Sequence, residues 1–308
     1  MTAMLNTSEI RVRDPFILAE NGTYHLYAQS ANREGSGFCG VEVYTSRDLK
    51  KWDAPKPVLR LPDDAGITDV WAPEVHRHNG AYFLFVTLTC RGTLDEPRPL
   101  DVHYWPQLHQ RGTWVFRATS PTGPFEAVKN GPLTPSTWMA LDGTLYVEDG
   151  VASMVFCHEW IQLVDGTMEV VELKPDLSAT VGEPKALFKA SDAPGAKTDP
   201  LDGKVTDGPF FYKSPRTGRL FMIWSTFVVG RGYCVLQTRS LTGRVAGPWT
   251  CHEPLFMGDG GHGMLFEAFD GRLLLALHQP NDGPLERMKL FEVREADAGL
   301  EIAGEVEA

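Results

Sequence analysis

The sequence predicts an all-β fold, specifically a five-bladed β-propeller. The main observation is a pair of turn residues ending in glycine, which recurs five times before a short apolar or aromatic run. A further apolar segment precedes each turn, and amphipathic helical periodicity is absent. The repeated turns are Asn21-Gly22, Asn79-Gly80, Asp149-Gly150, Thr217-Gly218 and Asp270-Gly271.

Each turn predicts a hairpin, because Asn-Gly and Asp-Gly favour tight turns whose central residues have positive φ. The first strands of these hairpins start near Asp14, Ala72, Gly143, Gly208 and Gly263. Third strands follow four of the hairpins, from Val41, Thr113, Met168 and Tyr233. Four of the five repeats therefore contain at least three consecutive antiparallel strands.

The turn glycines are 58, 70, 68 and 53 residues apart, which is room for a four-stranded blade and a loop. We therefore expect one catalytic domain, a propeller over residues 1–308. The alternative is a pair of β-sandwich domains, but no linker-like stretch divides the chain.

Composition favours a soluble protein that does not bind nucleic acid. The formal net charge is −11, with 43% hydrophobic and 22% charged residues, and no basic cluster offsets the acidity. We see neither a signal peptide nor an apolar run long enough for a membrane span. The five cysteines are odd in number and include no C-x-x-C pair. We expect a cytoplasmic location, no membrane partner and no particular oligomeric state.

Polar residues stand at or just before the starts of the first strands. They are Asp14, Asp69 with Trp71, Asp142, Asp207 and His262. In a propeller such positions face one central pocket, so these side chains are expected to converge. Converging carboxylates raise one another's pKa, which is typical of acid/base catalysis or of metal binding.

The chain resembles the family 43 glycoside hydrolases over nearly its whole length. The motifs that carry the resemblance are Arg13-Asp14-Pro15, Trp71-Ala72-Pro73-Glu74-Val75, Leu141-Asp142, Asp207-Gly208-Pro209 and Gly261-His262-Gly263. That family comprises five-bladed propellers acting on arabinose- and xylose-containing glycans. The resemblance implies a glycosidase with an oligosaccharide as its partner.

The resemblance also implies an inverting mechanism with three acidic residues. Asp14 matches the general base, and Asp142 matches the carboxylate that orients the acid and tunes its pKa. The acid is normally a glutamate at the start of the fourth blade, where this chain has the shorter Asp207. An inverting pair lies roughly 6.5 to 9.5 Å apart, so one methylene matters.

Glu159 is the first choice for the general acid, and Asp207 is the second. Glu159 lies between His158 and Trp160 at the end of a predicted strand, on the same face as the other carboxylates. Burial beside Trp160 would raise its pKa toward that of a general acid. The alternative is a surface glutamate beside a packed tryptophan; Asp207 would then share the acid role or bind a sugar hydroxyl.

Four more side chains are expected to bind substrate. Trp71 and Trp160 are candidate stacking platforms, although aromatic residues in propellers are more often core. Glu74 is either a sugar contact or a buried partner for an arginine such as Arg13, and His158 would orient Glu159.

The chemistry itself needs no cofactor. The resemblance implies a structural cation, calcium or another, on the propeller axis near His262, and the alternative is a turn histidine that bonds the backbone.

These observations predict an exo-acting, inverting glycosidase that releases L-arabinofuranose, D-xylose or a related unit from plant-type oligosaccharides. An endo-acting arabinanase or a galactofuranosidase is the alternative among enzymes. A carbohydrate-binding propeller without catalysis is the alternative outside them. Specificity is expected to depend on the loops over residues 91–111 and 190–204.

Overall fold

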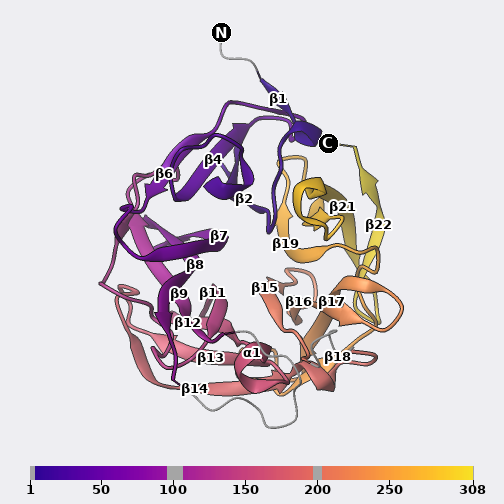
Figure 1. Ribbon diagram of the computed structural model, residues 1–308. Helices are drawn as coiled ribbons and strands as arrows, with labels where there is room; N and C mark the ends of the chain where they lie inside the picture. Colours follow the sequence, from indigo (N-terminus) through magenta and orange to yellow (C-terminus); the bar gives the residue numbers. More distant parts are fainter. Residues whose placement is uncertain (1–3, 96–106, 197–202, 308) are drawn as a thin grey trace.

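The computed structural model describes residues 4–95, 107–196 and 203–307. Five antiparallel sheets stand around a central axis, each with its first long strand innermost (Figure 1). The predicted all-β, five-bladed propeller is therefore confirmed. Parts of the two loops expected to set specificity, residues 96–106 and 197–202, lie outside the described residues.

The first two blades come from the N-terminal part of the chain. Blade 1 contains β1 (Leu5–Asn6), β2 (Phe16–Glu20), β3 (Thr23–Gln29), β4 (Gly40–Ser46), β5 (Lys51–Trp52) and β6 (Lys56–Arg60). Blade 2 contains β7 (Ile67–His78), β8 (Ala81–Thr93), β9 (His109–Ala118) and β10 (Glu126–Ala127).

The other three blades have four strands each. Blade 3 contains β11 (Ala140–Glu148), β12 (Val151–His158), β13 (Thr167–Leu173) and β14 (Thr180–Lys189). Blade 4 contains β15 (Asp207–Lys213), β16 (Leu220–Val228), β17 (Gly232–Ser240) and β18 (Trp249–Cys251). Blade 5 contains β19 (Gly261–Glu267), β20 (Leu273–Gln279), β21 (Arg287–Glu295) and β22 (Leu300–Val306).

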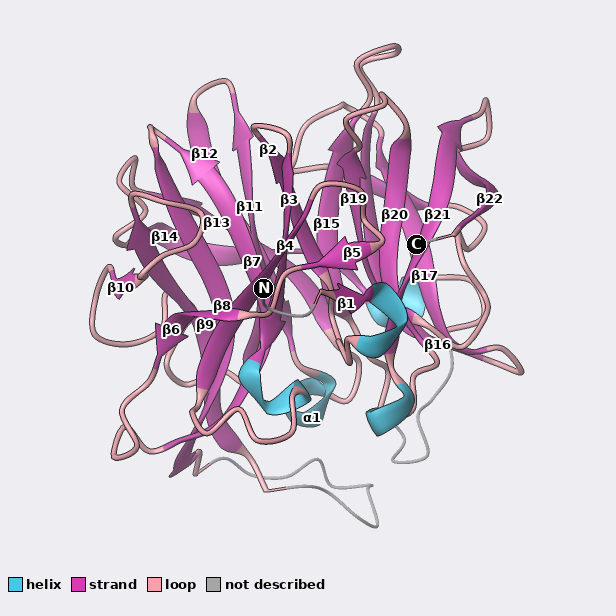
Figure 2. Cartoon of the chain, turned by 90° about the horizontal axis from the view of Figure 1, so that it is seen from above, coloured by secondary structure: helices cyan, strands magenta, loops and turns pink. Residues whose placement is uncertain are grey.

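Helices are short, and Figure 2 shows them toward one end of the strands. They are the α-helix α1 (Trp160–Leu163) and the 3-10 helices η1 (Thr7–Glu9), η2 (Ser30–Asn32), η3 (Ala190–Asp192) and η4 (Gly283–Leu285). In the described part of the chain, none has the length and apolar character needed to cross a membrane.

The five glycine turns each join the first two strands of a blade, as predicted, but they are of two kinds. In blades 1 to 3 both turn residues have positive φ, for example Asn21 at 51° and Gly22 at 72°. In blades 4 and 5 only Gly218 and Gly271 do, and the strands are joined by longer loops. For Thr217 the cause is steric, because a β-branched residue does not tolerate positive φ.

The hydrophobic core is divided among the junctions between blades. One cluster joins strands of blades 2 and 3, another blades 3 and 4, and another blades 4 and 5. The largest joins blades 5, 1 and 2. Because each blade packs apolar residues against both neighbours, the sheets hold their inner strands at fixed positions around the axis.

Within residues 4–307 as described, the ring closes without a strand shared between the first and last blades. Blade 1 is built from residues 5–60 and blade 5 from residues 261–306, and the two ends lie on the same side of the ring (Figure 1). Side chains and a single bridge between Arg11 and Arg287 join these blades. Arg287 Nε donates to the Ser8 carbonyl over 2.9 Å, and the Phe269 N–H donates to the Tyr24 hydroxyl over 2.9 Å.

Candidate active site

One backbone position recurs at the axis in all five blades. Near the start of each innermost strand, one residue has a left-handed conformation, which is unfavourable for residues other than glycine. The five residues and their φ values are Asp14 (54°), Ala72 (47°), Asp142 (56°), Gly208 (51°) and His262 (49°). In blades 2 to 5 a break in strand register falls at this position. Such an irregularity re-aims a side chain, here toward the axis.

This position corrects the alignment of the fourth blade. The sequence analysis treated Asp207 as the equivalent of Asp14 and Asp142, but the equivalent residue is Gly208. Asp207 stands one residue earlier, at the position that Trp71 occupies in blade 2. The register break is invisible in the sequence, because a strand motif alone does not show which residue bulges. Asp207 therefore approaches the pocket from a different direction than the two other aspartates.

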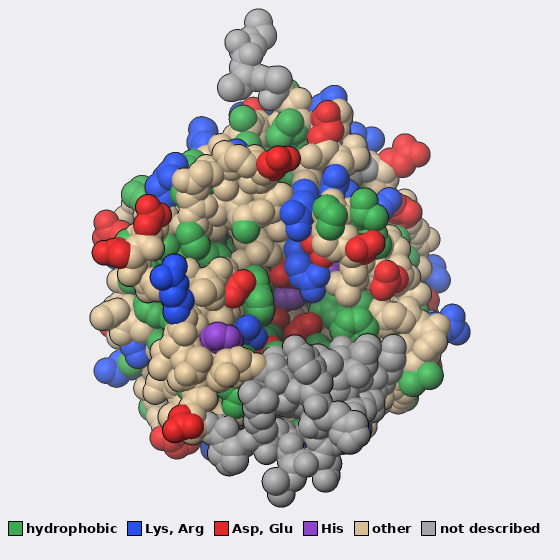
Figure 3. Space-filling view, in the orientation of Figure 1, with side chains coloured by type: hydrophobic (Ala, Val, Ile, Leu, Met, Phe, Trp, Pro, Cys, Tyr) green, Lys and Arg blue, Asp and Glu red, His purple; other side chains and the backbone are tan. Residues whose placement is uncertain are grey.

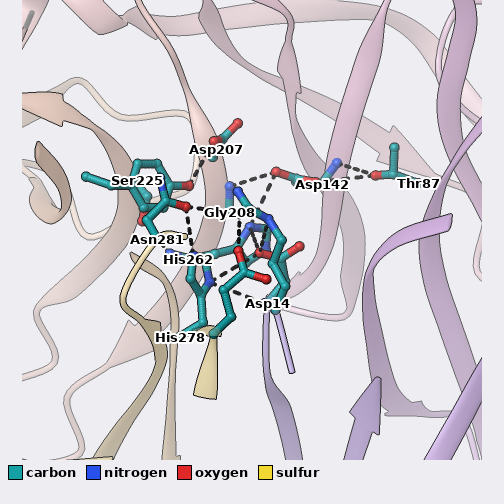
Figure 4. Close-up of polar contacts among 12 residues, drawn as sticks. Asp14, Thr87, Asp142, Asp207, Gly208, Ser225, His262, His278 and Asn281 are labelled. Carbon is teal, nitrogen blue, oxygen red and sulfur yellow. Dashed lines mark hydrogen bonds and ion pairs between the residues drawn. The ribbon is translucent and has the colours of Figure 1, made fainter. Parts of the chain in front are cut away.

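A second recurring position forms hydrogen bonds to the left-handed residues at the axis, here called bulges. The residue seven positions after each turn glycine lies on the second strand and is buried, and three such residues accept the N–H of the next blade's bulge. Asp142 N–H donates to Thr87 Oγ1 over 2.8 Å, His262 N–H to Ser225 Oγ over 2.8 Å, and Asp14 N–H to His278 Nδ1 over 3.3 Å (Figure 4).

Blade 3 departs from this pattern. Cys157 stands at its equivalent position, and the Gly208 N–H instead donates to Asp142 Oδ2 over 3.0 Å. This contact lies beside the His262 ring, since a Cβ on Gly208 would come within 2.8 Å of it. Only glycine combines this close approach with the left-handed φ.

The recurring positions surround a cavity of about 320 Å³ at the axis. Figure 3 shows acidic and histidine side chains inside the central hollow. The lining residues are Arg13, Asp14, Trp71, Leu141, Asp142, Glu159, Trp160, Val205, Asp207, Phe227, Tyr233 and His262. All four carboxylates proposed for catalysis thus line the same cavity.

His262 lies between two of these carboxylates. Its Nδ1 is 3.3 Å from Asp14 Oδ1 and 3.7 Å from Asp142 Oδ2 (Figure 4). Burial alone would lower the pKa of His262, but Asp14 and Asp142 outweigh it and raise the pKa above its usual value. A histidine cation here stabilises both aspartates in their ionised forms.

Asp14 is held as an anion. Burial acts to raise its pKa, but His262, Arg13 and the Ala72 backbone N–H together lower the pKa below its ordinary value. Asp14 Oδ1 is buried and lacks a hydrogen bond within the described residues. Three cationic or ring nitrogens, from His262, His278 and Arg13, lie 3.3 to 3.6 Å from this oxygen.

A network from the last blade fixes the backbone of Asp14. His278 Nδ1 accepts the Asp14 N–H, so Nε2 carries the proton and donates to Asn281 Oδ1 over 3.2 Å (Figure 4). Burial lowers the pKa of His278 to about 4, consistent with this neutral form. Arg13 Nη1 donates to Asn281 Oδ1 over 3.0 Å and to Glu286 Oε1 over 2.6 Å.

Asp207 is the carboxyl group best suited to carry a proton at neutral pH. Burial and the nearby Asp142 raise its pKa to about 7. Burial also raises the pKa of Asp142, to about 6, but the Gly208 N–H and His262 favour its ionised form. We therefore place the proton of this coupled pair on Asp207. The Tyr233 hydroxyl donates to Asp207 Oδ2 over 2.8 Å and leaves Oδ1 for the proton.

Glu159 has a different environment, because its carboxylate meets a buried cation. Arg111 Nη1 donates to Glu159 Oε2 over 2.5 Å, and the two side chains are almost fully buried. Burial raises the pKa of Glu159, and the charge and hydrogen bond of Arg111 oppose that rise. Protonating Glu159 would leave Arg111 buried without its counter-ion, which is costly.

The expected substrate-binding residues are divided between the cavity and its surroundings. Trp71 and Trp160 line the cavity. Glu74 and His158 are buried and are not among its lining residues. Glu74 Oε2 is 2.8 Å from His76 Nε2, so its partner is this histidine and not Arg13. The His158 ring stacks on that of Trp138 at 4.0 Å and is 2.8 Å from Gln162 Oε1.

The axial cation expected near His262 stays a prediction. Among the described residues, no three His, Cys, Asp or Glu side chains are arranged to hold a metal ion directly. The Nδ1 atom of His262 faces two carboxylates at ion-pair distances, so this side chain does not fit as a direct ligand through that atom.

Sequence reasoning overlooked Tyr233, Arg111, His278 and Asn281. A signal for His278 was present, since it stands seven residues after the fifth turn glycine, as Thr87 does after the second. Tyr233 and Arg111 stand outside the repeated positions, so no pattern in the chain indicated them.

Comparison with known proteins bears directly on this site. Residues 7–293 match the family described as Glycosyl hydrolases family 43. The chain belongs to this family. The matched residues include every residue that lines the cavity. The match confirms the resemblance to family 43 and the prediction of a glycosidase.

The individual proteins that match this chain share about a fifth to a third of their residues with it. A solved structure, the endo-arabinase from Bacteroides thetaiotaomicron VPI-5482, is 34% identical with a TM-score of 0.84, and the match covers 97% of this chain and 100% of that one. "Probable arabinan endo-1,5-alpha-L-arabinosidase A" from Aspergillus flavus is 21% identical, over 84% of this chain and 74% of that protein. "Probable arabinan endo-1,5-alpha-L-arabinosidase C" from Aspergillus fumigatus is 26% identical, over 36% of this chain and 35% of that protein.

Proposed function

We propose that this protein is an inverting glycosidase that removes single pentose units from plant-type oligosaccharides. The proposal is carried by two carboxyl groups with opposite environments in one cavity: His262 and Arg13 lower the pKa of Asp14, whereas burial and Asp142 raise the pKa of Asp207 to about 7. Inverting hydrolysis needs such a pair, one group to deprotonate water and one to protonate the leaving oxygen.

In this mechanism Asp14 is the general base and Asp207 the general acid. Asp14 takes a proton from water as the water attacks the anomeric carbon, and Asp207 donates its proton to the departing oxygen. Asp142 keeps the pKa of Asp207 high by its negative charge. Glu159, the first choice from the sequence, is less suited because of its ion pair with Arg111.

The dependence on leaving group tests the acid assignment. Without its acid, an inverting glycosidase still cleaves a 2,4-dinitrophenyl glycoside, whose leaving group needs no proton, but loses activity on substrates with poor leaving groups. We expect this selective loss, about 10²-fold or more, in Asp207→Asn and not in Glu159→Gln. A selective loss in Glu159→Gln and not in Asp207→Asn would instead identify Glu159 as the general acid.

The stereochemistry and the mode of action are tested by the products. Proton NMR in the first turnovers should show the inverted anomer. The cavity is at the small end of ligand pockets, which favours one sugar unit and exo action. Endo action on arabinan is the second candidate, favoured by the names of the relatives above. Linear 1,5-arabinan oligosaccharides should yield only monosaccharide if the enzyme is exo-acting, and mixed oligomers if it is endo-acting.

We also propose a cytoplasmic location. All five cysteines are free thiols, which suits a reducing compartment. Cell fractionation with an antibody against the chain tests this.

A further inference from the structure

We propose that Glu159 and Arg111 together form a receptor for one hydroxyl group of a neutral sugar, with Arg111 as the positioning residue. This inference rests on the proposed function, because it assigns a substrate contact within the same cavity. It gives Glu159 a role in choosing the substrate in place of proton transfer.

The first support is that one oxygen of Glu159 remains available. Oε2 is occupied by Arg111, whereas Oε1 has no hydrogen-bond partner within the described part of the chain. The residue lines the cavity although it is only 5% exposed. An ionised carboxylate accepts hydrogen bonds only, and a sugar hydroxyl is a donor that suits it.

The second support is that Arg111 is fixed from three sides and does not line the cavity. Its Nε donates to Thr89 Oγ1 over 2.8 Å, its Nη1 holds Glu159, and its guanidinium lies 4.2 Å from the ring centre of Trp71. Arg111 is itself buried, with 9% exposed. A planar, permanently charged group held this way favours the ionised form of Glu159 and holds the position of Trp71.

The third support is that aromatic side chains lie beside this carboxylate. Trp71 and Trp160 line the cavity with it, and the Trp160 ring packs directly on Gly203, where a Cβ would come within 1.7 Å of the ring. Tryptophan rings pack against the C–H faces of sugars while polar groups fix the orientation. Two rings and one acceptor oxygen are the chemistry of a sugar-binding subsite.

The charge of the cavity indicates which sugars enter. Four carboxyl groups line it, while Arg13 and His262 are the cationic side chains among its lining residues. Both cations already face carboxylates within the chain. A sugar carrying its own carboxylate would be repelled, so the receptor should take neutral sugars and reject uronic acids.

The test measures Glu159→Gln on 4-nitrophenyl glycosides of arabinofuranose and xylopyranose and on their monodeoxy analogues. We expect kcat/KM on the parent glycoside to fall about 10- to 100-fold, mainly through KM, and equally for good and poor leaving groups. One deoxy analogue should be a poor substrate for the unaltered enzyme and lose nothing further in the variant. Equal losses on every deoxy analogue, or a loss confined to poor leaving groups, would refute the receptor.

Arg111 is tested separately, as Arg111→Lys and Arg111→Met. Both variants should lose activity on the parent sugar and spare the same deoxy analogue, because Arg111 acts through Glu159. Glu42→Gln is the control, since Glu42 is also buried and paired with an arginine at 2.8 Å outside the cavity, although that arginine, Arg33, is partly exposed. It should lower Tm without changing kcat/KM; a similar change in kcat/KM would mean that any lost buried ion pair has this effect.

Calorimetric binding of L-arabinose, D-xylose and D-glucuronate separates failure of this inference from failure of the proposed function. In one outcome, the unaltered protein hydrolyses no glycoside and yet binds a neutral sugar more tightly than Glu159→Gln does. In that case the receptor stands and the hydrolase proposal fails. Tight glucuronate binding, or unchanged affinity for the neutral sugars in Glu159→Gln, would overturn the receptor.

Discussion

Replacing Tyr233 by phenylalanine should shift the pH dependence of the enzyme toward alkaline pH. The hydroxyl donates to Asp207 Oδ2 over 2.8 Å, a hydrogen bond that favours the ionised carboxylate and lowers the pKa of Asp207. Phenylalanine keeps the ring, which stacks on His278, and removes only the donor. The pKa of Asp207, about 7 with tyrosine present, should therefore rise.

The size of the shift follows from the strength of the bond. A hydrogen bond to a charged group contributes about 1.5 to 3 kcal/mol, which corresponds to about 1 to 2 pKa units. We expect the lower end, about 1 unit, because the phenol also hydrogen bonds to the protonated carboxyl group. Since the acid must be protonated in the free enzyme, the alkaline limb of kcat/KM should move up by that amount.

The assay is kcat/KM against pH, with a substrate whose leaving group needs protonation. The acidic limb, which reports the general base Asp14, should stay in place. An alkaline limb that is unmoved in Tyr233→Phe but displaced in Arg111→Lys would refute Asp207 as the acid and favour Glu159.

Three more predictions follow from the same contacts. His262→Gln removes the cation 3.3 Å from Asp14, so the pKa of Asp14 should rise and the acidic limb of kcat/KM should move up by about 1 pH unit; an unmoved limb would contradict this role. Gly208→Ala should lower Tm and kcat, the latter about 10-fold or more, because its Cβ would strike the His262 ring. Gly218→Ala carries a similar positive φ in open space and should lower Tm by less with kcat unchanged; equal effects would exclude the clash as the cause. Asp207→Asn should raise Tm roughly 2 to 4 °C at pH 8 and not at pH 4, because a raised pKa costs stability only once the carboxyl ionises in the unfolded chain; a gain equal at both pH values would contradict this.

The fold could be predicted because hairpins are encoded locally. Asn21-Gly22 and Asn79-Gly80 specify tight turns by backbone preference alone, and short apolar or aromatic runs specify the strands beside them. Their fivefold recurrence then implies the ring. The meeting of Asp14 and Asp142 at the axis follows from the ring, so these two could be proposed without any structure.

The rest of the site depends on contacts between residues far apart in the sequence, which no local pattern specifies. The ion pair of Glu159 and Arg111 joins residues 48 positions apart, and the hydrogen bond from Tyr233 to Asp207 joins residues 26 positions apart. Asp207 lies at a register break, one residue before the left-handed position of its strand. The direction of its side chain therefore could not be predicted from the sequence. Sequence reasoning therefore supplied the acid candidates, Glu159 and Asp207, but their surroundings could be compared only in the structure.

The junction of the first and last blades has a consequence for the integrity of the enzyme. Glu286, Asn281 and His278 bind Arg13 and the backbone of Asp14, so the proposed general base lies at the contact that closes the ring. If the two terminal blades separate, Asp14 therefore loses the contacts that position it, before the strands within any sheet separate. Every blade is also a contiguous segment, so the chain could be circularly permuted, with its present ends linked and new ends cut between blades 2 and 3. In such a permutant a peptide linker would join blades 1 and 5 covalently. It should keep its activity at temperatures at which the protein with its present strand order has lost activity.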